Sequence, residues 1–337
     1  MDWLVYVGYV AMVVIIVFLS IKLGKYVDVI DAKSNISGAF IGGVMLAAVT
    51  SLPELFTSLS AVWIVKENSL IIGNILGSDL INLAFFGLIL LIFGRGLKKN
   101  KFSKFYYVAL TVLLGMYALT EIGLAFSDYI QIGWYSLVSP LILVLYVVYV
   151  FKMPKESERE DDGDDGLTLK QAVVRFVICA VVLIGASIAM TYLTDIVSDN
   201  LGLSEKKTFA GALFLGVATS LPELISSFEL CRRGNYNAAT GNIIGSNIFN
   251  FTILFVADVF SFMPGASNVY LYNVDSTWLL ILGAIAVVVT MIMMAVNNAK
   301  KELPIKRVGV YALNVVPPAL YVIYLLISTG IIAVAVV

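Results

Sequence analysis

Two closely matching stretches, each set inside an apolar segment, decide how this chain is organised. The first reads LAAVTSLPELFTSL over Leu46–Leu59, and the second reads LGVATSLPELISSF over Leu215–Phe228. Each is followed, at almost the same offset, by a further match: GNILGSDLIN from Gly73 and GNIIGSNIFN from Gly241. Two long matches in the same order indicate that the chain is an internal duplication.

The composition predicts that most of the chain lies in a lipid bilayer. Of 337 residues, 60% are hydrophobic and 13% are charged, and the mean hydropathy is +0.95. A soluble domain usually carries about 25% charged residues, so this chain lacks the charge for a water-facing surface. Its apolar runs are continuous and near the roughly 20 residues that span a bilayer core, which favours helices over a barrel. We therefore expect an all-α, multi-pass protein of the cell membrane.

Ten transmembrane helices are expected. They are predicted near Trp3–Leu23, Ser37–Val62, Leu70–Phe93, Phe105–Leu119, Ile132–Phe151, Leu169–Leu193, Phe209–Leu230, Ala239–Phe260, Trp278–Val296 and Val308–Ala333. Residues 1–151 would form a first five-helix repeat, residues 152–171 a linker, and residues 172–337 a second five-helix repeat. The N-terminus has no basic region or small-residue cleavage site, so the first helix is expected to be a permanent span.

The basic residues predict the orientation of these helices. All but three of the 22 Lys and Arg residues fall on one side of the predicted map, the exceptions being Lys66, Lys206 and Lys207. Because positive residues are retained on the cytoplasmic side, both termini are predicted to be extracellular and the linker cytoplasmic. The two matching stretches begin on the second and seventh spans. An odd separation of five spans makes them point in opposite directions, which predicts an inverted-topology repeat.

The linker 152–171 is the one long polar stretch, and it is rich in acidic residues. The simplest interpretation is a solvated connection between the two repeats. The alternative is a small regulatory Ca²⁺ site at Asp161, Asp162, Asp164 and Asp165. That stretch lacks the ligand spacing and the closing Glu of an EF-hand loop, so the solvated linker is preferred.

Two glutamates are the strongest candidates for a functional role. Glu54 and Glu223 occupy matched positions deep inside predicted spans, where a bare carboxylate costs at least a few kcal/mol. A single such acid could be a protonated packing residue, but a matched pair from inverted repeats should converge near the midplane. Two neighbouring carboxylates repel unless they share protons or a cation. The preceding Pro53 and Pro222 are expected to free the carbonyls of Val49 and Ala218 and to disturb the turns Ala47–Thr50 and Gly216–Thr219. The freed carbonyls could bind a cation or accept from nearby Ser and Thr hydroxyls.

The helices that follow add polar residues spaced three and four apart, which places them on one helical face. These are Ser78, Asp79 and Asn82 in the first repeat and Ser246, Asn247 and Asn250 in the second. Gly73, Gly77, Gly241 and Gly245 form small-residue faces that allow helices to approach closely. All the candidates are hard oxygen or amide ligands, which suit Ca²⁺ or Na⁺ rather than soft transition metals.

With these motifs the chain resembles the cation/calcium exchanger superfamily, and especially its sodium/calcium exchanger branch. The resemblance rests on the paired TSLPEL and paired GN-I-x-GS-x-x-x-N motifs, and it extends over essentially the whole chain. It implies alternating access, with Ca²⁺ and Na⁺ competing for one cluster of sites. By resemblance, the ligands would be Glu54 and Glu223 at the centre, Thr50 and Thr219, Ser78 and Ser246, the carbonyls of Ala47 and Gly216, and Asn82 and Asn250.

The chain departs from the family pattern at three points. Family members often carry Asp at the position of Asn250, where an Asp is linked to K⁺ co-transport or to proton occupancy, so K⁺ dependence is not expected here. Asp79 replaces the usual Asn and adds a third carboxylate to the candidate ligands, and the sequence does not say which way it faces. The first repeat also has one more residue than the second between its glutamate and its final Asn.

The predicted function is a secondary active antiporter that exchanges Ca²⁺ for Na⁺ across the lipid bilayer. The alternative on the same fold is a Ca²⁺/H⁺ antiporter, and TSLPEL favours Na⁺ over the GN-x-x-E form of the proton-coupled branch. A channel is a further alternative, distinguished by flux that does not need a counter-ion. No P-loop, zinc motif or Ser/His pair is present, and the chain has no histidine. Neither enzyme activity, nor a cofactor, nor a nucleic-acid partner is expected.

Overall fold

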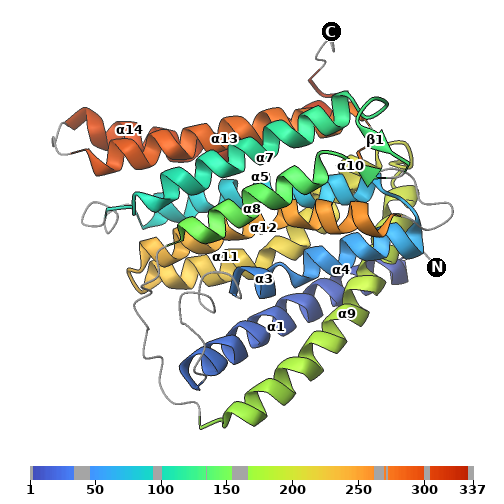
Figure 1. The fold of residues 1–337 in the computed structure, drawn as a ribbon, viewed down its shortest axis with the longest axis horizontal. Helices are drawn as coiled ribbons and strands as arrows, with labels where there is room; N and C mark the ends of the chain where they lie inside the picture. The colour runs from blue at the N-terminus through green and yellow to red at the C-terminus, as the bar shows by residue number, and fades with distance from the viewer. Residues whose placement is uncertain are drawn as a thin grey trace.

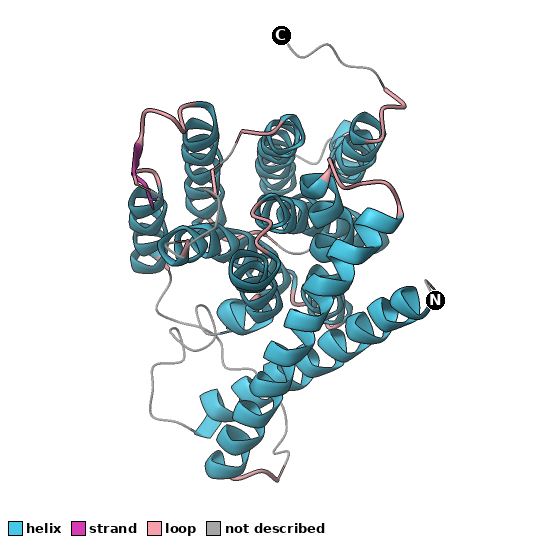
Figure 2. Ribbon diagram, turned by 90° about the vertical axis from the view of Figure 1, so that its right-hand side faces the viewer, coloured by secondary structure: helices cyan, strands magenta, loops and turns pink. Residues whose placement is uncertain are grey.

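The protein is almost entirely helical in its computed structural model (Figure 1, Figure 2). The structure describes residues 3–33, 46–93, 101–133, 135–153, 166–261, 269–270, 272–299 and 304–332. The elements are α1 Trp3–Lys33, α3 Leu46–Thr50, α4 Leu52–Ser60, η2 Ala61–Val65, α5 Ser69–Ile92, α7 Phe105–Ala125, β1 Gln131–Ile132, β2 Tyr135–Ser136, α8 Ser139–Lys152, α9 Leu169–Asn200, α10 Lys207–Ala210, η3 Gly211–Gly216, α11 Val217–Arg232, α12 Tyr236–Phe260, α13 Val274–Asn298 and α14 Pro304–Ser328. The helical turns η2 and η3 are π-helical.

Eight helical segments of the described chain are long and apolar enough to cross a membrane. They are Trp3–Val27, Ser69–Ile92, Phe105–Ala125, Leu169–Asn200, Lys207–Arg232, Tyr236–Phe260, Val274–Asn298 and Gly309–Ser328. The other two expected spans overlap the shorter apolar helices Leu52–Val65 and Ser139–Lys152. Residues 34–45, in which the second expected span begins, and the acidic candidates of the linker lie outside the described residues.

The fifth expected span is wrong at its beginning. Instead of a helix from Ile132, the chain forms a two-residue antiparallel hairpin in which Gln131 pairs with Ser136 and Ile132 with Tyr135. Gly133, with φ +65°, supplies the left-handed turn conformation that glycine adopts readily. The helix α8 starts only at Ser139 and has 14 residues, which at 1.5 Å per residue is roughly 21 Å.

The centre of the bundle is formed by α5 and α12, whose apolar windows are 78% and 72% buried. The helix α5 packs against η3, α11, α13 and α14, and α12 packs against α4, α7, α8 and α11. The approach of α5 to the second repeat is backbone to backbone. A Cβ atom on Gly73 would lie 2.0 Å from the Thr208 carbonyl oxygen, and one on Gly77 would lie 2.4 Å from the Ala212 Cα atom. The expected close-approach role of these two glycines is confirmed.

The long helices α1 and α9 form a separate pair that crosses the bundle obliquely (Figure 1). Each extends beyond its expected span, α1 to Lys33 and α9 to Asn200. Their membrane windows are only 17% and 22% buried. The pair therefore touches the core of the bundle over a small part of its surface.

The polar contacts of this pair to the bundle lie in the N-terminal part of α1 and the C-terminal part of α9. The Tyr9 hydroxyl donates to the Phe214 carbonyl oxygen of η3 at 2.8 Å, and the Thr191 hydroxyl donates to the Thr57 carbonyl oxygen of α4 at 3.2 Å. At the start of α10, the Lys207 ammonium group forms ion pairs with Asp195 and Asp199 of α9. These contacts fasten one end of the pair to the helices that carry the two glutamates.

Candidate ion-binding site

The two glutamates come together at the centre of the bundle from different repeats. Glu54 lies on α4 and Glu223 on α11, and both side chains are completely buried. Their carboxyl groups are close enough to interact electrostatically. The contacts between α4 and α12 and between α11 and α5 place each glutamate helix against the polar helix of the other repeat. The convergence expected from the sequence is therefore present in the fold.

The Glu223 carboxyl group has donors from both repeats. Its Oε1 atom accepts from the Ser246 hydroxyl at 3.1 Å and from the Ser51 hydroxyl at 3.4 Å, and these two hydroxyls are 2.7 Å apart. Thr50 also lies against this carboxyl group. The first repeat thus supplies part of the surroundings of the glutamate of the second repeat.

The Glu54 carboxyl group is placed differently. Thr219 lies beside it, but the Thr219 hydroxyl donates to the Leu215 carbonyl oxygen at 2.9 Å. Ser78 lies 3.4 Å from the Thr219 hydroxyl and donates to the Gly216 carbonyl oxygen at 3.3 Å. Within the described residues, neither oxygen of the Glu54 carboxyl group has a hydrogen-bond partner.

Asp79 faces the second repeat, which resolves the orientation that the sequence left open. Its Oδ1 atom accepts from the Asn250 side-chain amide at 3.0 Å. In the matching arrangement, Asn82 donates to the Asn247 side-chain oxygen at 2.9 Å, and Asn247 donates to the Asp79 backbone carbonyl oxygen at 3.0 Å. All four side chains are fully buried. They form a polar contact between α5 and α12 close to the glutamates, since Asp79 also interacts electrostatically with Glu54.

Oxygen atoms without donors accumulate in this region. Counting only described residues, they are both carboxyl oxygens of Glu54, Glu223 Oε2, Asp79 Oδ2, Asn82 Oδ1 and Asn250 Oδ1. Leaving a buried polar atom unsatisfied costs roughly 1 to 3 kcal/mol. No Lys or Arg of the described chain forms an ion pair with any of the three acids. The arrangement offers hard oxygen ligands and three carboxyl groups to a cation.

Three residues of the paired motifs have contacts that the sequence interpretation missed. Asn74 donates to the Thr57 hydroxyl at 3.0 Å and to the Glu54 carbonyl oxygen at 3.4 Å, and Asn242 donates to the Ser227 hydroxyl at 3.0 Å and to the Glu223 carbonyl oxygen at 3.3 Å. Each therefore fastens the glutamate helix of its own repeat. Ser51 is the third. The signal was the repetition of GN and of TSLPEL in both halves, of which only the acids, threonines, prolines and glycines were used.

Ala47 and Gly216 are the two residues expected to supply backbone carbonyl ligands, and the structure describes more contacts for Gly216 than for Ala47. The Gly216 carbonyl oxygen accepts from Ser78, and a Cβ atom at this glycine would lie 2.9 Å from the Ser78 backbone nitrogen. Ala47 lies on α3, and the surroundings of its side chain are outside the description. The corresponding roles as carbonyl ligands stay predictions.

The proline-induced irregularity also differs between the repeats. In the first repeat the helix breaks at Ser51, with φ −90° and ψ 12°, between α3 and α4. In the second repeat α11 continues through Pro222, and the irregular π-helical turn lies earlier, at Gly211–Gly216. The expected disturbance over Gly216–Thr219 is therefore wrong beyond Gly216. The additional residue of the first repeat lies between Glu54 and Gly73. In that stretch the glutamate helix ends in the π-helical turn η2, where hydrogen bonds span one more residue.

A family model described as sodium/calcium exchanger protein matches residues 4–153 and, a second time, residues 171–330. The chain belongs to this exchanger family. The double match agrees with the internal duplication, and it identifies a multi-pass membrane protein of an ion-exchanging family rather than a family of enzymes.

Relatives of this chain include a bacterial and an archaeal protein that each match it over most of its length. The inner membrane protein YrbG of Escherichia coli is 28% identical over 291 residues, which cover 80% of this chain and 84% of YrbG. The sodium/calcium exchanger MaX1 of Methanosarcina acetivorans is 25% identical over 276 residues, which cover 70% of this chain and 77% of MaX1. Among solved structures, the H⁺/Ca²⁺ exchanger CAX superposes with a TM-score of 0.69 at 14% identity, covering 97% of this chain and 87% of CAX. At that identity the likeness shows the fold alone.

Proposed function

We propose that this exchanger moves Ca²⁺ against Na⁺, and that both ions use the cluster around Glu54 and Glu223. The observation that carries the proposal is the set of buried acceptor oxygens without donors, contributed by both repeats and accompanied by three carboxyl groups. Ca²⁺ takes six to eight oxygen ligands, so carboxylates, amide oxygens, hydroxyls and carbonyls of this region suit it. Thr50, Thr219, Ser78, Ser246, Asn82, Asn250, Asp79, Ala47 and Gly216 are the proposed further ligands.

Coupling follows from competition for the same carboxylates. One Ca²⁺ ion neutralises two negative charges, and Na⁺ ions can do the same only when they occupy the same oxygens. Moving bare carboxylates through a closed apolar barrier is costly, so the protein changes its orientation only when the site is filled. Either ion then moves in exchange for the other.

We further propose ten transmembrane segments in two inverted repeats. The eight long helices and the two shorter apolar helices make ten segments when α3, α4 and η2 are taken as one. In Figure 1 the chain leads from α3 to α4 towards the right and from α10 to α11 towards the left, which supports opposite directions for the two repeats. Glu54 lies in the second of these segments and Glu223 in the seventh. A separation of five segments, an odd number, also makes the two repeats run in opposite directions.

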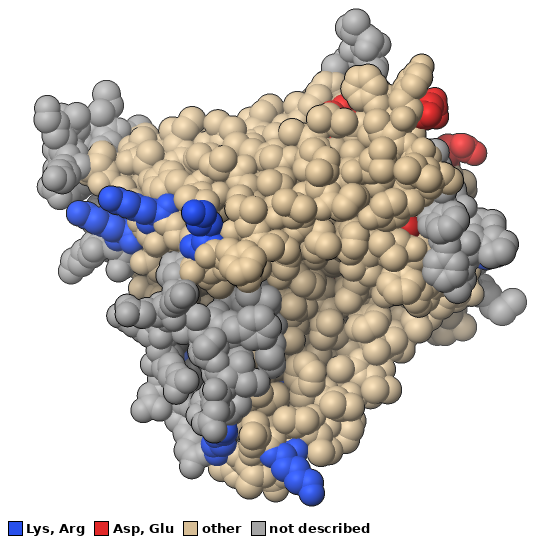
Figure 3. Space-filling view, viewed as in Figure 1, with Lys and Arg blue, Asp and Glu red and all other residues tan. Residues whose placement is uncertain are grey.

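The charge distribution supports extracellular termini. Figure 3 has Lys and Arg at the left and along the lower edge of the view, and Asp and Glu at the right. Both termini lie towards the acidic end (Figure 1). Because basic residues mark the cytoplasmic side, the left end of these views is the proposed cytoplasmic face. The lightly attached pair of α1 and α9 is the proposed moving part.

The coupling ion has two candidates. The TSLPEL motifs and the relative MaX1, which is named a sodium/calcium exchanger, favour Na⁺. The fold of the H⁺/Ca²⁺ exchanger CAX supports a Ca²⁺/H⁺ antiporter as the alternative. In that case the same glutamates would exchange protons for Ca²⁺, which carboxylates can do without histidine.

Uptake of radioactive Ca²⁺ into proteoliposomes tests the proposal. The vesicles carry an outward Na⁺ gradient or an outward H⁺ gradient at a clamped membrane potential. Glu54→Gln and Glu223→Gln should abolish uptake driven by Na⁺. The matched control is Glu229→Gln, because Glu229 lies on the same helix as Glu223 but is partly exposed and paired with Arg232 and Arg233. Uptake driven only by H⁺ would select the alternative, and Na⁺-driven uptake that survives both changes would overturn the proposed site.

A further inference from the structure

The free ends of α1 and α9 form a small unit of their own, away from the glutamates. Val29 and Ile30 of α1 pack against Ala172 of α9 in a separate apolar cluster. The Lys33 ammonium group of α1 donates to the Leu167 carbonyl oxygen, just before α9, at 2.6 Å. The two helices are therefore joined to one another at this end, on the opposite side from their polar contacts with the bundle.

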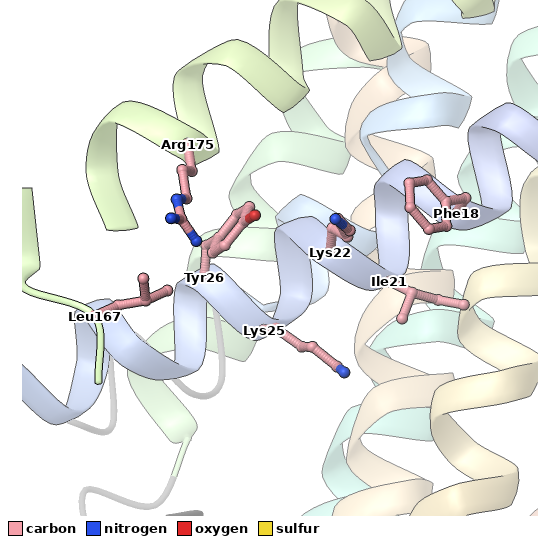
Figure 4. A pocket seen from close by; sticks show the side chains of 7 residues that line it. All are labelled: Phe18, Ile21, Lys22, Lys25, Tyr26, Leu167 and Arg175. Carbon is pink, nitrogen blue, oxygen red and sulfur yellow. The ribbon is translucent and has the colours of Figure 1, made fainter. Parts of the chain in front are cut away.

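A basic pocket lies between the two helices next to this cluster (Figure 4). Lys22, Lys25 and Tyr26 line it from α1, and Arg175 lines it from α9. Figure 4 shows Arg175 reaching from α9 towards Tyr26. Because α1 and α9 belong to different repeats, the pocket exists only where the two repeats meet.

The three cations of this pocket lack acidic partners in the described part of the chain. All three are exposed. The Lys22 ammonium group lies 4.9 Å from the centre of the Phe18 ring. All three side chains line the pocket, and in Figure 4 Lys25 is directed away from Arg175. Three positive groups without acidic partners attract an anion that carries more than one acceptor oxygen.

The cations lie at the level of one membrane surface. The α1 sequence is free of charged residues from Leu4 to Ile21, roughly 27 Å of helix at 1.5 Å per residue. This matches a hydrocarbon core of about 30 Å. Lys22 therefore falls where the headgroups begin. Arg175 occupies the same position on α9, because the sequence from Phe176 to Thr194 is free of charged residues.

Apolar side chains continue from the pocket along the outer face of both helices. Val14 and Phe18 of α1 and Ile178 and Val181 of α9 are each more than half exposed. An apolar face of this kind in a membrane protein is covered by lipid acyl chains. The combination of an apolar face and a basic end has the shape and chemistry of a phospholipid with a negatively charged headgroup.

We propose that this pocket binds the phosphate headgroup of an anionic phospholipid, with Lys22, Lys25 and Arg175 around the phosphate and the acyl chains along α1 and α9. Basic pockets between membrane helices on the cytoplasmic side recognise such headgroups. Tyr26 adds an amphipathic ring at the headgroup level. The lipid would join the two repeats at their peripheral helices. This binding claim does not depend on which ion is exchanged.

The test measures binding of cardiolipin and phosphatidylglycerol to the purified full-length protein by native mass spectrometry, with phosphatidylcholine as the neutral reference. The triple variant Lys22→Gln, Lys25→Gln, Arg175→Gln should bind anionic lipid roughly ten- to a hundredfold more weakly, with phosphatidylcholine binding unchanged. The matched control removes three exposed cations outside the pocket, by Lys101→Gln, Lys104→Gln and Lys152→Gln, and should retain at least half of the binding. Equal losses in both triple variants would overturn the proposal.

Two further arms keep the test decisive. A photoreactive anionic lipid on the unmodified protein should label peptides from residues 3–33 and 166–185, and labelling confined to other helices would overturn the proposal even if the triple variant does not fold. The acidic sequence 156–165 is the competing occupant. In this arm the Asp and Glu residues of 156–165 are changed to Asn and Gln. Unchanged lipid binding would show that the lipid is the occupant of the pocket. If anionic lipid binds only after the change, the linker occupies the pocket and the proposal fails.

Discussion

The two repeats carry the same TSLPEL motif, yet their glutamates have different surroundings. Glu223 accepts hydrogen bonds from Ser246 of its own repeat and from Ser51 of the other, whereas Glu54 has no donor among the described residues. Ser220, the counterpart of Ser51, is buried without a hydrogen-bond partner in the described chain. The structure of the site is therefore asymmetric although the motifs are identical.

The asymmetry has a visible origin in the backbone. The first repeat breaks at Ser51 and has its π-helical turn after the glutamate, whereas the second has its π-helical turn before the glutamate and continues through the proline. A helix break redirects the side chain next to it, so Ser51 reaches Glu223 while Ser220 does not reach Glu54. Identical side chains thus acquire different partners because the chain on either side of them differs.

The largest effect is expected from the glutamates themselves, and it sharpens the comparison. Ca²⁺ at a hundred times its dissociation constant should stabilise the folded protein by about 2.7 kcal/mol, and both Glu54→Gln and Glu223→Gln should lose this stabilisation. In ion-free buffer the two should differ. Glu223→Gln replaces charge-assisted hydrogen bonds by neutral ones and should cost about 1 kcal/mol, whereas Glu54→Gln removes no hydrogen bond. Thermal unfolding in detergent measures both quantities, and equal behaviour in ion-free buffer would contradict the asymmetry.

The next effect compares two matched glycines. In Gly73→Ala the new methyl group would meet the Thr208 carbonyl oxygen of the opposing backbone, which cannot move without shifting a helix. We expect a loss of about 2 kcal/mol in the free energy of unfolding. In Gly241→Ala the nearest atom is the Tyr106 hydroxyl oxygen at 3.1 Å, the end of a side chain that can adjust, so the loss should stay within about 1 kcal/mol. Thermal unfolding of the two variants would disprove this ranking if Gly241→Ala were the less stable.

A smaller effect is expected from the third carboxyl group. Asp79→Asn removes one negative charge near Glu54 and should raise the half-maximal Ca²⁺ concentration for uptake roughly tenfold. The double change Asp79→Asn, Asn250→Asp returns the charge to the other end of the same hydrogen bond and should restore most of the affinity. If the double variant is no better than Asp79→Asn, then Asp79 has its role through its position rather than through its charge.

The smallest effect is expected from the serines that precede Leu52 and Leu221. Ser51→Ala removes a donor from Glu223 and should raise the half-maximal Ca²⁺ concentration by a factor of about five to ten, equivalent to roughly 1 to 1.4 kcal/mol. Ser220→Ala removes no described hydrogen bond and should change it less than twofold. Concentration-dependent uptake by the two variants decides between this order and a symmetric site, in which both changes would have the same effect.

Much of the architecture can be predicted from local patterns of the chain. The helical membrane class follows from apolar runs of bilayer length, and the duplication follows from the repeated motifs. The approach of α5 through Gly73 and Gly77 follows from their spacing. The hairpin before α8 was missed because the sequence Gln131–Ser136 is apolar enough to read as the beginning of the apolar run of α8. Only the backbone reversal at Gly133 separates the hairpin from that helix. The roles of Asn74 and Asn242 were missed because their partners lie on another helix.

The sequence by itself determined that this chain is a duplicated helical membrane protein with an acid buried in each half, because bilayer length, low charge and repetition are properties of the chain alone. Only the tertiary structure decided which hydroxyl reaches which carboxyl group, that Asp79 meets Asn250, and that Lys22, Lys25 and Arg175 share one pocket. These pairings join residues of different repeats, far apart along the chain. Their geometry depends on how two helices cross and where each backbone breaks, and no local pattern along the chain encodes that crossing.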